Sequence, residues 1–209
     1  MKKKQKPYAP STDKNRDDIL KVLKQIISPD NFRLIEIGSG TGQHAIYLAP
    51  HFKNLQWVTT DVPYKLDGIK MWLKEACVSN VHGPLAFEVG KDEFPRQKCD
   101  VVFAANTFHI LSWKDNKALI KMLGNRLRVG AKVLFYGAFN YDGKFTSASN
   151  EEFDKELKLE DSKRGIRNFE DVERAMLKAG FKLTRDFAMP ANNRILYFTR
   201  LEHTKKTED

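Results

Sequence analysis

The stretch Leu34-Ile35-Glu36-Ile37-Gly38-Ser39-Gly40-Thr41-Gly42 decides the fold of this chain. An apolar run carrying an acidic residue leads into three glycines at alternate positions, and an amphipathic helix is expected over residues 43–52. The pattern predicts a strand that turns sharply into a helix N-terminus. Glycine lets the backbone approach a ligand where a Cβ would collide, and the free N–H groups of the helix start face the same place.

The next predicted strand, residues 55–60, ends in Asp61. Asp61 follows Gly42 by 19 positions, close to the ~20 typical of the carboxylate that binds a ribose in a nucleoside-binding βαβ unit. The two features together predict a nucleoside cofactor.

Composition favours a single globular domain. The 209 residues fit the ~100–200 of a typical domain, and 14 Phe supply a core. We expect a flexible basic tail at residues 1–10, one domain at 11–202 and a polar tail at 203–209. Four lysines of the first six residues carry much of the net charge of +9, so nucleic-acid binding is possible but not favoured.

Cysteine usage and hydropathy predict the compartment. Cys77 and Cys99 fall in apolar segments without metal-type spacing, which predicts buried free thiols in a reducing compartment. No secretory signal is recognisable, and no window approaches the ~20 apolar residues of a membrane span. We expect a cytoplasmic protein without a membrane partner. The oligomeric state is not predicted.

Hydrophobic periodicity extends the βα pattern along the chain. Side chains of Ser11-Thr12-Asp13 are expected to cap a first helix. Strands are then expected at 33–37, 55–61, 85–89, 100–105 and 132–137, and helices at 43–52, 65–76, 91–98 (poorly helical) and 113–127. Residues 139–150, rich in Gly, Ser, Asn and Tyr, predict a functional loop.

The last third predicts two charged helices at 151–159 and 169–178, and then strands at 181–188 and 194–200. The connection 189–193 is so short that these strands must pair antiparallel. We therefore expect an α/β fold of five βα units, mostly parallel, followed by an antiparallel hairpin.

Two phosphate-binding interpretations of the glycine turn are less favoured. A dinucleotide site has the pattern G-x-G-x-x-G, but Gln43 stands where its last glycine would fall, and no Gly-Lys-Ser/Thr of a Walker loop follows. The turn instead resembles motif I of class I S-adenosylmethionine-dependent methyltransferases, and the final hairpin resembles the end of their seven-stranded Rossmann-like sheet. The resemblance implies S-adenosylmethionine as cofactor and S-adenosylhomocysteine as product.

The resemblance narrows to the methyltransferase-like protein 26 group, small methyltransferase-like proteins without an assigned substrate. It covers Tyr8 to about Arg200 and is carried by motifs at both ends of the chain. These are Tyr8-Ala9-Pro10, Lys14-Asn15-Arg16-Asp17-Asp18-Ile19-Leu20, Gly38-Ser39-Gly40-Thr41-Gly42-Gln43-His44, Ser149-Asn150-x-x-Phe153-Asp154, Gly165-Ile166-Arg167 and Met189-Pro190-Ala191-Asn192-Asn193.

The resemblance implies a set of cofactor-binding residues. Glu36 would anchor the turn and the cofactor's amino group, Asp61 would bind both ribose hydroxyls, and Glu88 would lie near the adenine. Alternatively, Glu36 is a buried structural carboxylate, Asp61 is a helix cap, and Glu88 is an exposed strand end. The full set is Arg16, Glu36, Gly38, Ser39, Gly40, Gly42, Gln43, His44, Asp61, Glu88 and Asn106.

Asn106-Thr107-Phe108-His109 follows the fourth strand, at the edge where open α/β sheets bind ligands. Amino-directed methyltransferases often carry Asn/Asp-Pro-Pro-Tyr/Phe here, and the departure argues against such N-methylation. His109 and Asn106 are the candidate catalytic residues, with His109 as the base, although it could equally be a satisfied wall residue.

Candidate acceptor-binding residues are aromatic or amide side chains, for which core packing and turn chemistry are the alternatives. They are Phe108, Trp113, Tyr141, Asn150, Asn192 and Asn193. His44, His51, His82 and His203 show no metal-ligand spacing, so no metal is predicted.

These observations predict an S-adenosylmethionine-dependent methyltransferase acting on a small molecule by in-line transfer. A cofactor-binding regulatory or interaction protein without turnover, an RNA-directed methyltransferase and, less favoured, an NAD oxidoreductase are the alternatives.

Overall fold

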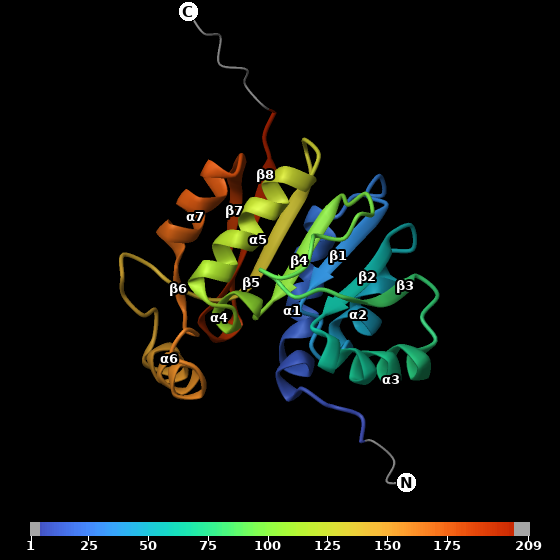
Figure 1. Cartoon of the computed structure of the whole chain (residues 1–209), viewed down its shortest axis with the longest axis horizontal. Helices are drawn as coiled ribbons and strands as arrows, with labels where there is room; N and C mark the ends of the chain where they lie inside the picture. Colours follow the sequence, from blue (N-terminus) through green and yellow to red (C-terminus); the bar gives the residue numbers. More distant parts are fainter. Residues whose placement is uncertain (1–4, 203–209) are drawn as a thin grey trace, which may run out of the picture.

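The computed structural model describes residues 5–202, which form one central sheet covered by helices on both faces (Figure 1). The described strands are β1 Arg33–Ile37, β2 Gln56–Asp61, β3 Val81–Ala86, β4 Val101–Ala105, β5 Lys132–Asn140, β6 Arg167–Asn168, β7 Phe181–Met189 and β8 Asn193–Arg200. The described α-helices are α1 Pro10–Ile26, α2 Gln43–Leu48, α3 Leu66–Ala76, α4 Thr107–Ile110, α5 Trp113–Arg126, α6 Ala148–Glu160 and α7 Phe169–Lys178. Short 3₁₀ turns cover Ala49–His51, Pro63–Lys65 and Pro190–Asn192.

The main sheet has the strand order β3-β2-β1-β4-β5-β8-β7, and the two-residue β6 pairs with β5. Strands β1 to β5 pair in parallel, whereas β8 runs antiparallel to both β5 and β7. The predicted fold class, a mostly parallel α/β sheet that ends in an antiparallel pair, is confirmed.

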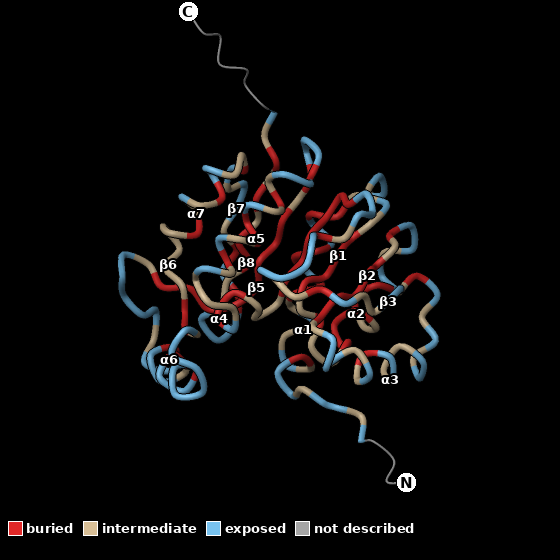
Figure 2. Tube along the Cα trace, viewed as in Figure 1, coloured by how far each residue is buried: buried red, intermediate tan, exposed pale blue. Residues whose placement is uncertain are grey.

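The central strands are buried on both faces, as β4 illustrates. Val101 and Phe103 join the core beneath α1 and α2, whereas Val102 and Ala104 join the core beneath α5 and α7. Because successive side chains point to opposite faces, a strand covered by helices on both sides needs an unbroken apolar run. Figure 2 shows buried residues concentrated along the central strands, while α6 is largely exposed.

The parallel register brings three strand ends to one edge of the sheet. Glu36 of β1 lies opposite both Thr59 of β2 and Phe103 of β4. The chain enters α2 and α4 just beyond the carboxyl ends of β1 and β4, at the edge that faces α3 and α4 in Figure 1. The glycine turn, Asp61 and Asn106 therefore meet there.

Several predicted boundaries differ from the observed ones, and two of the differences affect the fold. The helix expected over residues 43–52 ends at Leu48, because Pro50 lies in the following 3₁₀ turn and has no N–H for a helical bond. The strand expected at 85–89 is β3 at Val81–Ala86, since pairing with β2 stops where Asp61 meets Ala86. No helix forms over residues 91–98, so one of the five expected βα units lacks its helix.

The start of α1 also differs. The expected cap at Ser11-Thr12-Asp13 is wrong, because α1 begins at Pro10 with Ala9 as its N-cap and no side-chain cap bond. Proline suits this first position because its missing N–H would be unsatisfied in any helix. Residues 1–4 of the predicted tail and residues 203–209 lie outside the described residues.

Strand β5 ends later than predicted, and helix α6 begins earlier than predicted. Strand β5 runs on to Asn140, into the segment expected to be a loop. Helix α6 begins at Ala148, because the Ser147 hydroxyl accepts a hydrogen bond from the Asn150 N–H and caps the helix.

Of the two free cysteines, Cys99 is buried as expected, but Cys77 is exposed. None of the described helices is both long and apolar enough to cross a bilayer.

Candidate functional site

The glycine turn between β1 and α2 combines close packing with an open face. Gly38, Gly40 and Gly42 all have positive φ, at 70°, 61° and 89°. A Cβ on Gly38 would lie 2.9 Å from Thr107 Oγ1, and one on Gly42 would lie 3.1 Å from Ile69 Cγ2. A Cβ on Gly40 would meet no atom within 4 Å. Two glycines therefore permit packing, and the third leaves its backbone open toward a cavity.

Glu36 holds the turn from beneath. Its Oε2 atom accepts hydrogen bonds from Ser39 Oγ at 2.9 Å and from Trp57 Nε1 at 3.0 Å. The side chain is almost fully buried, and burial raises the pKa of Glu36 to about 7. Ser39 Oγ in turn accepts the Thr60 N–H at 3.1 Å. Glu36 thus anchors the turn, and it does not line the cavity above.

Asp61 joins the end of β2 to the same turn. Its Oδ2 atom accepts the Gly40 N–H at 2.7 Å, and its Oδ1 atom accepts the Val62 N–H at 2.8 Å. Burial raises the pKa of Asp61, while Lys65 and these amides act in the opposite direction. The carboxylate lies in the cavity wall beside Gly40. It fixes the backbone of the turn and remains accessible from the cavity.

This cavity, the Gly40 cavity, has a volume of about 950 Å³. Its walls come from the glycine turn, the segments after β2, β3 and β4, and the segment before α1. Of the predicted cofactor-binding residues, those in its wall are Gly38, Ser39, Gly40, His44, Asp61, Glu88 and Asn106. Glu88 Oε1 also pairs with Lys91 Nζ at 2.7 Å.

Residues 5–9, which we call the strap, form one wall of the Gly40 cavity. Lys6 Nζ lies 2.5 Å from Glu75 Oε2 and 3.7 Å from the centre of the Trp72 ring. Trp72 Nε1 donates a hydrogen bond to the Pro7 carbonyl at 2.6 Å. Pro7 packs on Gly68, where a Cβ would lie 2.5 Å from Pro7 Cγ. These contacts dock the strap on α3.

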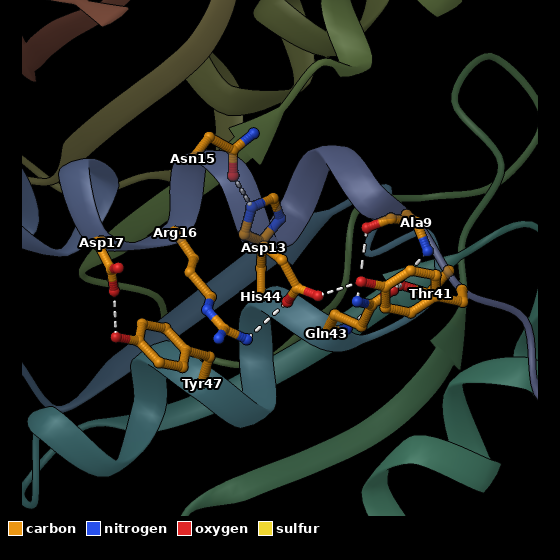
Figure 3. A network of polar contacts seen from close by, with 10 residues as sticks. Ala9, Asp13, Asn15, Arg16, Asp17, Thr41, Gln43, His44 and Tyr47 are labelled. Atoms are coloured by element: carbon orange, nitrogen blue, oxygen red, sulfur yellow. Dashed lines mark hydrogen bonds and ion pairs between the residues drawn. The ribbon is translucent and has the colours of Figure 1, made fainter.

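Gln43 connects the strap to the glycine turn (Figure 3). Its Oε1 atom accepts the Ala9 N–H at 2.7 Å and the Thr41 hydroxyl at 2.9 Å. Gln43 is buried and does not line the Gly40 cavity. The structure therefore places Gln43 behind the cavity wall, where it positions the wall and has no direct access to a ligand.

His44 and Arg16 tie α1 to α2 in the same network (Figure 3). His44 Nε2 hydrogen-bonds Asn15 Oδ1 at 2.8 Å, and burial lowers the pKa of His44 to about 4. Arg16 Nη1 pairs with Asp13 at 2.6 Å, and its guanidinium lies 4.3 Å from the centre of the Tyr47 ring. Arg16 lines neither cavity described here, although its buried Nε has no hydrogen-bond partner among residues 5–202.

A second cavity, the His109 cavity, has a volume of about 490 Å³. Ser11 and Asn106 line both cavities, so the two adjoin at the carboxyl end of β4. Asn106 has φ of 59° and is the N-cap residue of the one-turn helix α4. The remaining wall of the His109 cavity consists of Lys14, Asn15, Asp18, His109, Tyr136, Ala138, Ser149, Asn150, Phe153, Met189, Pro190, Ala191 and Asn193.

His109 is buried in the wall of this cavity, with its ring edge against Phe153 at a centroid distance of 5.0 Å. Burial, and secondarily the nearby Arg167 guanidinium, lowers the pKa of His109 to about 4. The imidazole is therefore neutral at physiological pH. None of the described residues forms a hydrogen bond with the ring.

The predicted acceptor-binding residues divide between the cavity and the core. Asn150 and Asn193 line the His109 cavity, and the Asn192 carbonyl accepts a hydrogen bond from Asn150 Nδ2 at 3.3 Å. Asn193 Nδ2 bonds the carbonyls of its own turn. Asn192 itself does not line the cavity.

The three aromatic candidates line neither cavity. Phe108 is buried against Phe135 at a centroid distance of 4.1 Å, and Trp113 packs on the same core. Tyr141 donates a hydrogen bond to Asp186 at 2.6 Å and stacks on Phe169. The structure thus gives these three side chains packing roles, because all three contact the core beneath α5 and α7.

Sequence reasoning missed much of both walls. The strap resembled a solvated tail, and Tyr64, which lines the Gly40 cavity, follows a strand without any motif. Phe153 and Met189 of the His109 cavity come from α6 and β7.

Across residues 5–202, no cluster of three His, Cys, Asp or Glu could hold a metal ion. His203 lies outside the described residues.

Residues 6–200 match the family model described as "Protein of unknown function (DUF938)". The chain belongs to this family. The narrower resemblance to the methyltransferase-like protein 26 group stays a prediction.

Solved structures share the fold at low sequence identity. The S-adenosylmethionine-dependent methyltransferase SibL matches with a TM-score of 0.76 and 20% identity over 92% of this chain and 56% of SibL. The O-methyltransferase family 2 protein from Planctomyces limnophilus DSM 3776, in complex with apigenin, matches with a TM-score of 0.77 and 13% identity. This match covers 90% of this chain and 56% of that protein. CalO1 of calicheamicin biosynthesis, in its S-adenosylhomocysteine-bound form, matches with a TM-score of 0.70 and 15% identity. This match covers 88% of this chain and 54% of CalO1.

These matches establish a methyltransferase fold for the chain. The chain spans just over half the length of each of these three proteins.

The docking of the strap predicts the effect of Gly68→Ala. The added methyl group has no room beneath Pro7, although alanine favours the helix itself by up to ~1 kcal/mol. We expect the Ala9 amide, which bonds Gln43, to exchange its hydrogen roughly tenfold faster as the strap loosens. Lys70→Ala, on the exposed face of α3, is the control. Unchanged exchange at Ala9 in Gly68→Ala would show that the strap does not depend on this contact.

The burial of His109 predicts a specific loss of stability in acid. Its pKa falls from 6.5 to about 4 on folding. Between these values the unfolded chain binds a proton that the folded chain excludes, so the free energy of unfolding decreases as the pH drops through this range. His109→Gln should lessen that decrease by on the order of 3 kcal/mol. Urea unfolding at several pH values measures it, with His51→Gln at an exposed site as control, and parallel curves for His109→Gln and wild type would contradict it.

Proposed function

We propose that this protein is an S-adenosylmethionine-dependent methyltransferase that methylates a small molecule. The observation that carries the proposal is the junction of two cavities at Asn106 and Ser11. One cavity has the features of a nucleoside site, and the other adjoins it with a buried neutral histidine in its wall. A group-transfer enzyme needs this arrangement, because donor and acceptor must meet while each is held by its own wall.

The residues of the Gly40 cavity fit the cofactor. The open face at Gly40 accommodates a ligand close to the backbone, and Asp61 presents a carboxylate suited to two ribose hydroxyls. Glu88 and Tyr64 lie in the wall beyond Asp61 and would flank the adenine. When bound, S-adenosylmethionine supplies an electrophilic methyl group. CalO1, which shares the fold, binds its spent form, S-adenosylhomocysteine.

His109 has the properties of a group that receives a proton from the acceptor. Its ring is neutral at pH 7, and it forms no hydrogen bond with the described residues, so a lone pair is free to accept one from a hydroxyl. The asparagines at positions 106 and 150 lie in the same wall and would orient the acceptor. A hydroxyl acceptor agrees with the O-methyltransferases among the structural relatives.

The size and lining of the His109 cavity favour a small acceptor. Its volume of about 490 Å³ lies within the ~300–1,000 Å³ of small-molecule sites. Lys14 and Asp18 are its charged wall residues, one of each sign, so it offers no positively charged groove for a nucleic-acid backbone. The turnover experiment below also tests the two alternatives, an RNA-directed enzyme and a protein without turnover.

Cofactor binding tests the first half of the proposal. Calorimetry of the purified chain should detect both S-adenosylmethionine and S-adenosylhomocysteine. Asp61→Asn should weaken both by roughly tenfold or more, because a hydrogen bond to a charged group is worth ~1.5–3 kcal/mol. Asp142→Asn, at an exposed turn, serves as the matched control. Absence of binding by the wild-type protein would refute the proposed function.

Turnover tests the second half. Incubation with methyl-labelled cofactor and fractionated cell extract should transfer label to a metabolite of low mass, detected by mass spectrometry. His109→Gln should reduce the transfer by on the order of 10²-fold, the contribution of a general base. Label in RNA would instead support the RNA-directed alternative, and cofactor binding without label in any fraction would support a protein without turnover.

A further inference from the structure

The helix that carries His109 is a single turn of four residues, too short to be stable by itself. Its carbonyl groups are bonded by a segment almost 60 positions later in the chain. The Gly165 N–H donates to the His109 carbonyl at 2.9 Å. Arg167 donates from Nε to the Phe108 carbonyl at 3.2 Å and from Nη2 to the Leu111 carbonyl at 2.5 Å. Residues 165–167 thus bond three carbonyls around His109, and Asn116 Nδ2 of α5 also bonds two of them, those of Phe108 and Leu111.

Residues 165–167 are themselves fixed. The buried Asp154 of α6 accepts the Ile166 N–H at 2.7 Å and pairs with Lys158 at 2.5 Å. A Cβ on Gly165 would lie 2.7 Å from Asp154 Oδ1, so this contact requires glycine. Arg167 also begins β6, which pairs with the end of β5. The segment is therefore a rigid support anchored to both α6 and the sheet.

We propose that Arg167 is a positioning residue for His109, holding α4 through two backbone carbonyls so that the imidazole stays fixed in the wall of the His109 cavity. The inference rests on the proposed function for its catalytic meaning, but its structural content stands separately. The planar guanidinium suits this role because its fixed fork of donors reaches two acceptors at once. It gives a purpose to the Gly165-Ile166-Arg167 motif, which lines neither cavity.

Arg167 acts on His109 by charge as well as by geometry. Its positive charge disfavours protonation of the ring and supports the low pKa that burial produces. Asp154, which pairs with Lys158, interacts electrostatically with Arg167, and the wall of the His109 cavity adds Lys14 and Asp18. Arg167 is the one charged group among these that shifts the pKa of His109.

Two substitutions separate the fork from the charge. Arg167→Gln removes both, whereas Arg167→Lys keeps the charge but replaces the two separate guanidinium donors by one ammonium group on a flexible stem. Asn116 Nδ2, which also bonds the Phe108 and Leu111 carbonyls, at 2.7 and 3.4 Å, is unchanged in both variants. Arg164→Gln is the matched control, because the Arg164 side chain pairs with Glu160 and forms none of the hydrogen bonds to α4. Two readouts need no acceptor: hydrogen exchange of the Leu111 amide, which bonds the Thr107 carbonyl and reports on α4, and the NMR titration of the His109 ring, assigned with His109→Gln.

We expect Leu111 to exchange roughly tenfold faster in both Arg167 variants, with no change in Arg164→Gln. The titration midpoint of His109 should rise by about 1 pH unit in Arg167→Gln and stay near the wild-type value in Arg167→Lys. If Arg167→Gln does not fold, Leu111 exchange in Arg167→Lys decides. A normal Leu111 rate in the Arg167 variants would overturn the proposal. So would faster exchange spread evenly over β4 and α5 with an unchanged His109 titration, which indicates only general stabilisation.

Cofactor calorimetry on the same samples keeps the two proposals apart. A wild-type protein that binds no S-adenosylmethionine refutes the proposed function, while the exchange and titration data still decide whether Arg167 positions His109. A wild-type protein that binds the cofactor, with Arg167→Gln indistinguishable in both readouts, refutes the positioning role alone.

Discussion

The hydrogen bond from the Gly40 amide to the Asp61 carboxylate joins the first two strands at the point where they border the Gly40 cavity. The turn after β1 has positive φ at all three glycines and would not keep this path without support. Asp61 supports it from the side, and Glu36 supports it from below through Ser39. Because the same Asp61 carboxylate lines the cavity, the interaction that builds the turn also prepares the wall for a ligand.

The two cavities are mechanically connected through α1. Its first turn borders the His109 cavity, and the strap that precedes it borders the Gly40 cavity. Gln43 bonds the strap, and His44 bonds Asn15 one helical turn further on. A displacement of α1 would therefore alter both walls together. This geometry explains why so many polar side chains near the glycine turn bond protein atoms and remain unavailable to a ligand.

The sequence was informative where a feature is local. The glycine turn, Asp61 at a strand end and the antiparallel β7–β8 pair each follow from a few consecutive residues, and the structure contains all three. Helix ends were less predictable, as at Pro50, where a proline inside an apolar pattern shortened α2. Helix α5, by contrast, begins at the predicted Trp113, where Ser112 caps it, and ends at Arg126, one residue before the predicted end.

Site residues were predictable only where their position in the sheet fixes their direction. Asn106 follows β4 and faces the ligand edge, whereas Phe108, two residues on, turns into the core. The sequence alone does not distinguish these outcomes, because both residues follow the same strand. The strap presented the opposite problem: its lysines and prolines are typical of a solvated tail, and only the distant Trp72 and Gly68 give it a docking place.

The support of α4 shows how a single helical turn can hold a buried histidine in place. One helical turn has almost no stability of its own, since nucleation fixes several residues for a single bond. In this protein the cost is offset by Arg167, Gly165 and Asn116, which bond carbonyls of α4 and of Leu111 from outside the helix. The ring of His109 can then stay buried and neutral without a side-chain hydrogen bond from the described residues, which leaves its lone pair for whatever enters the His109 cavity.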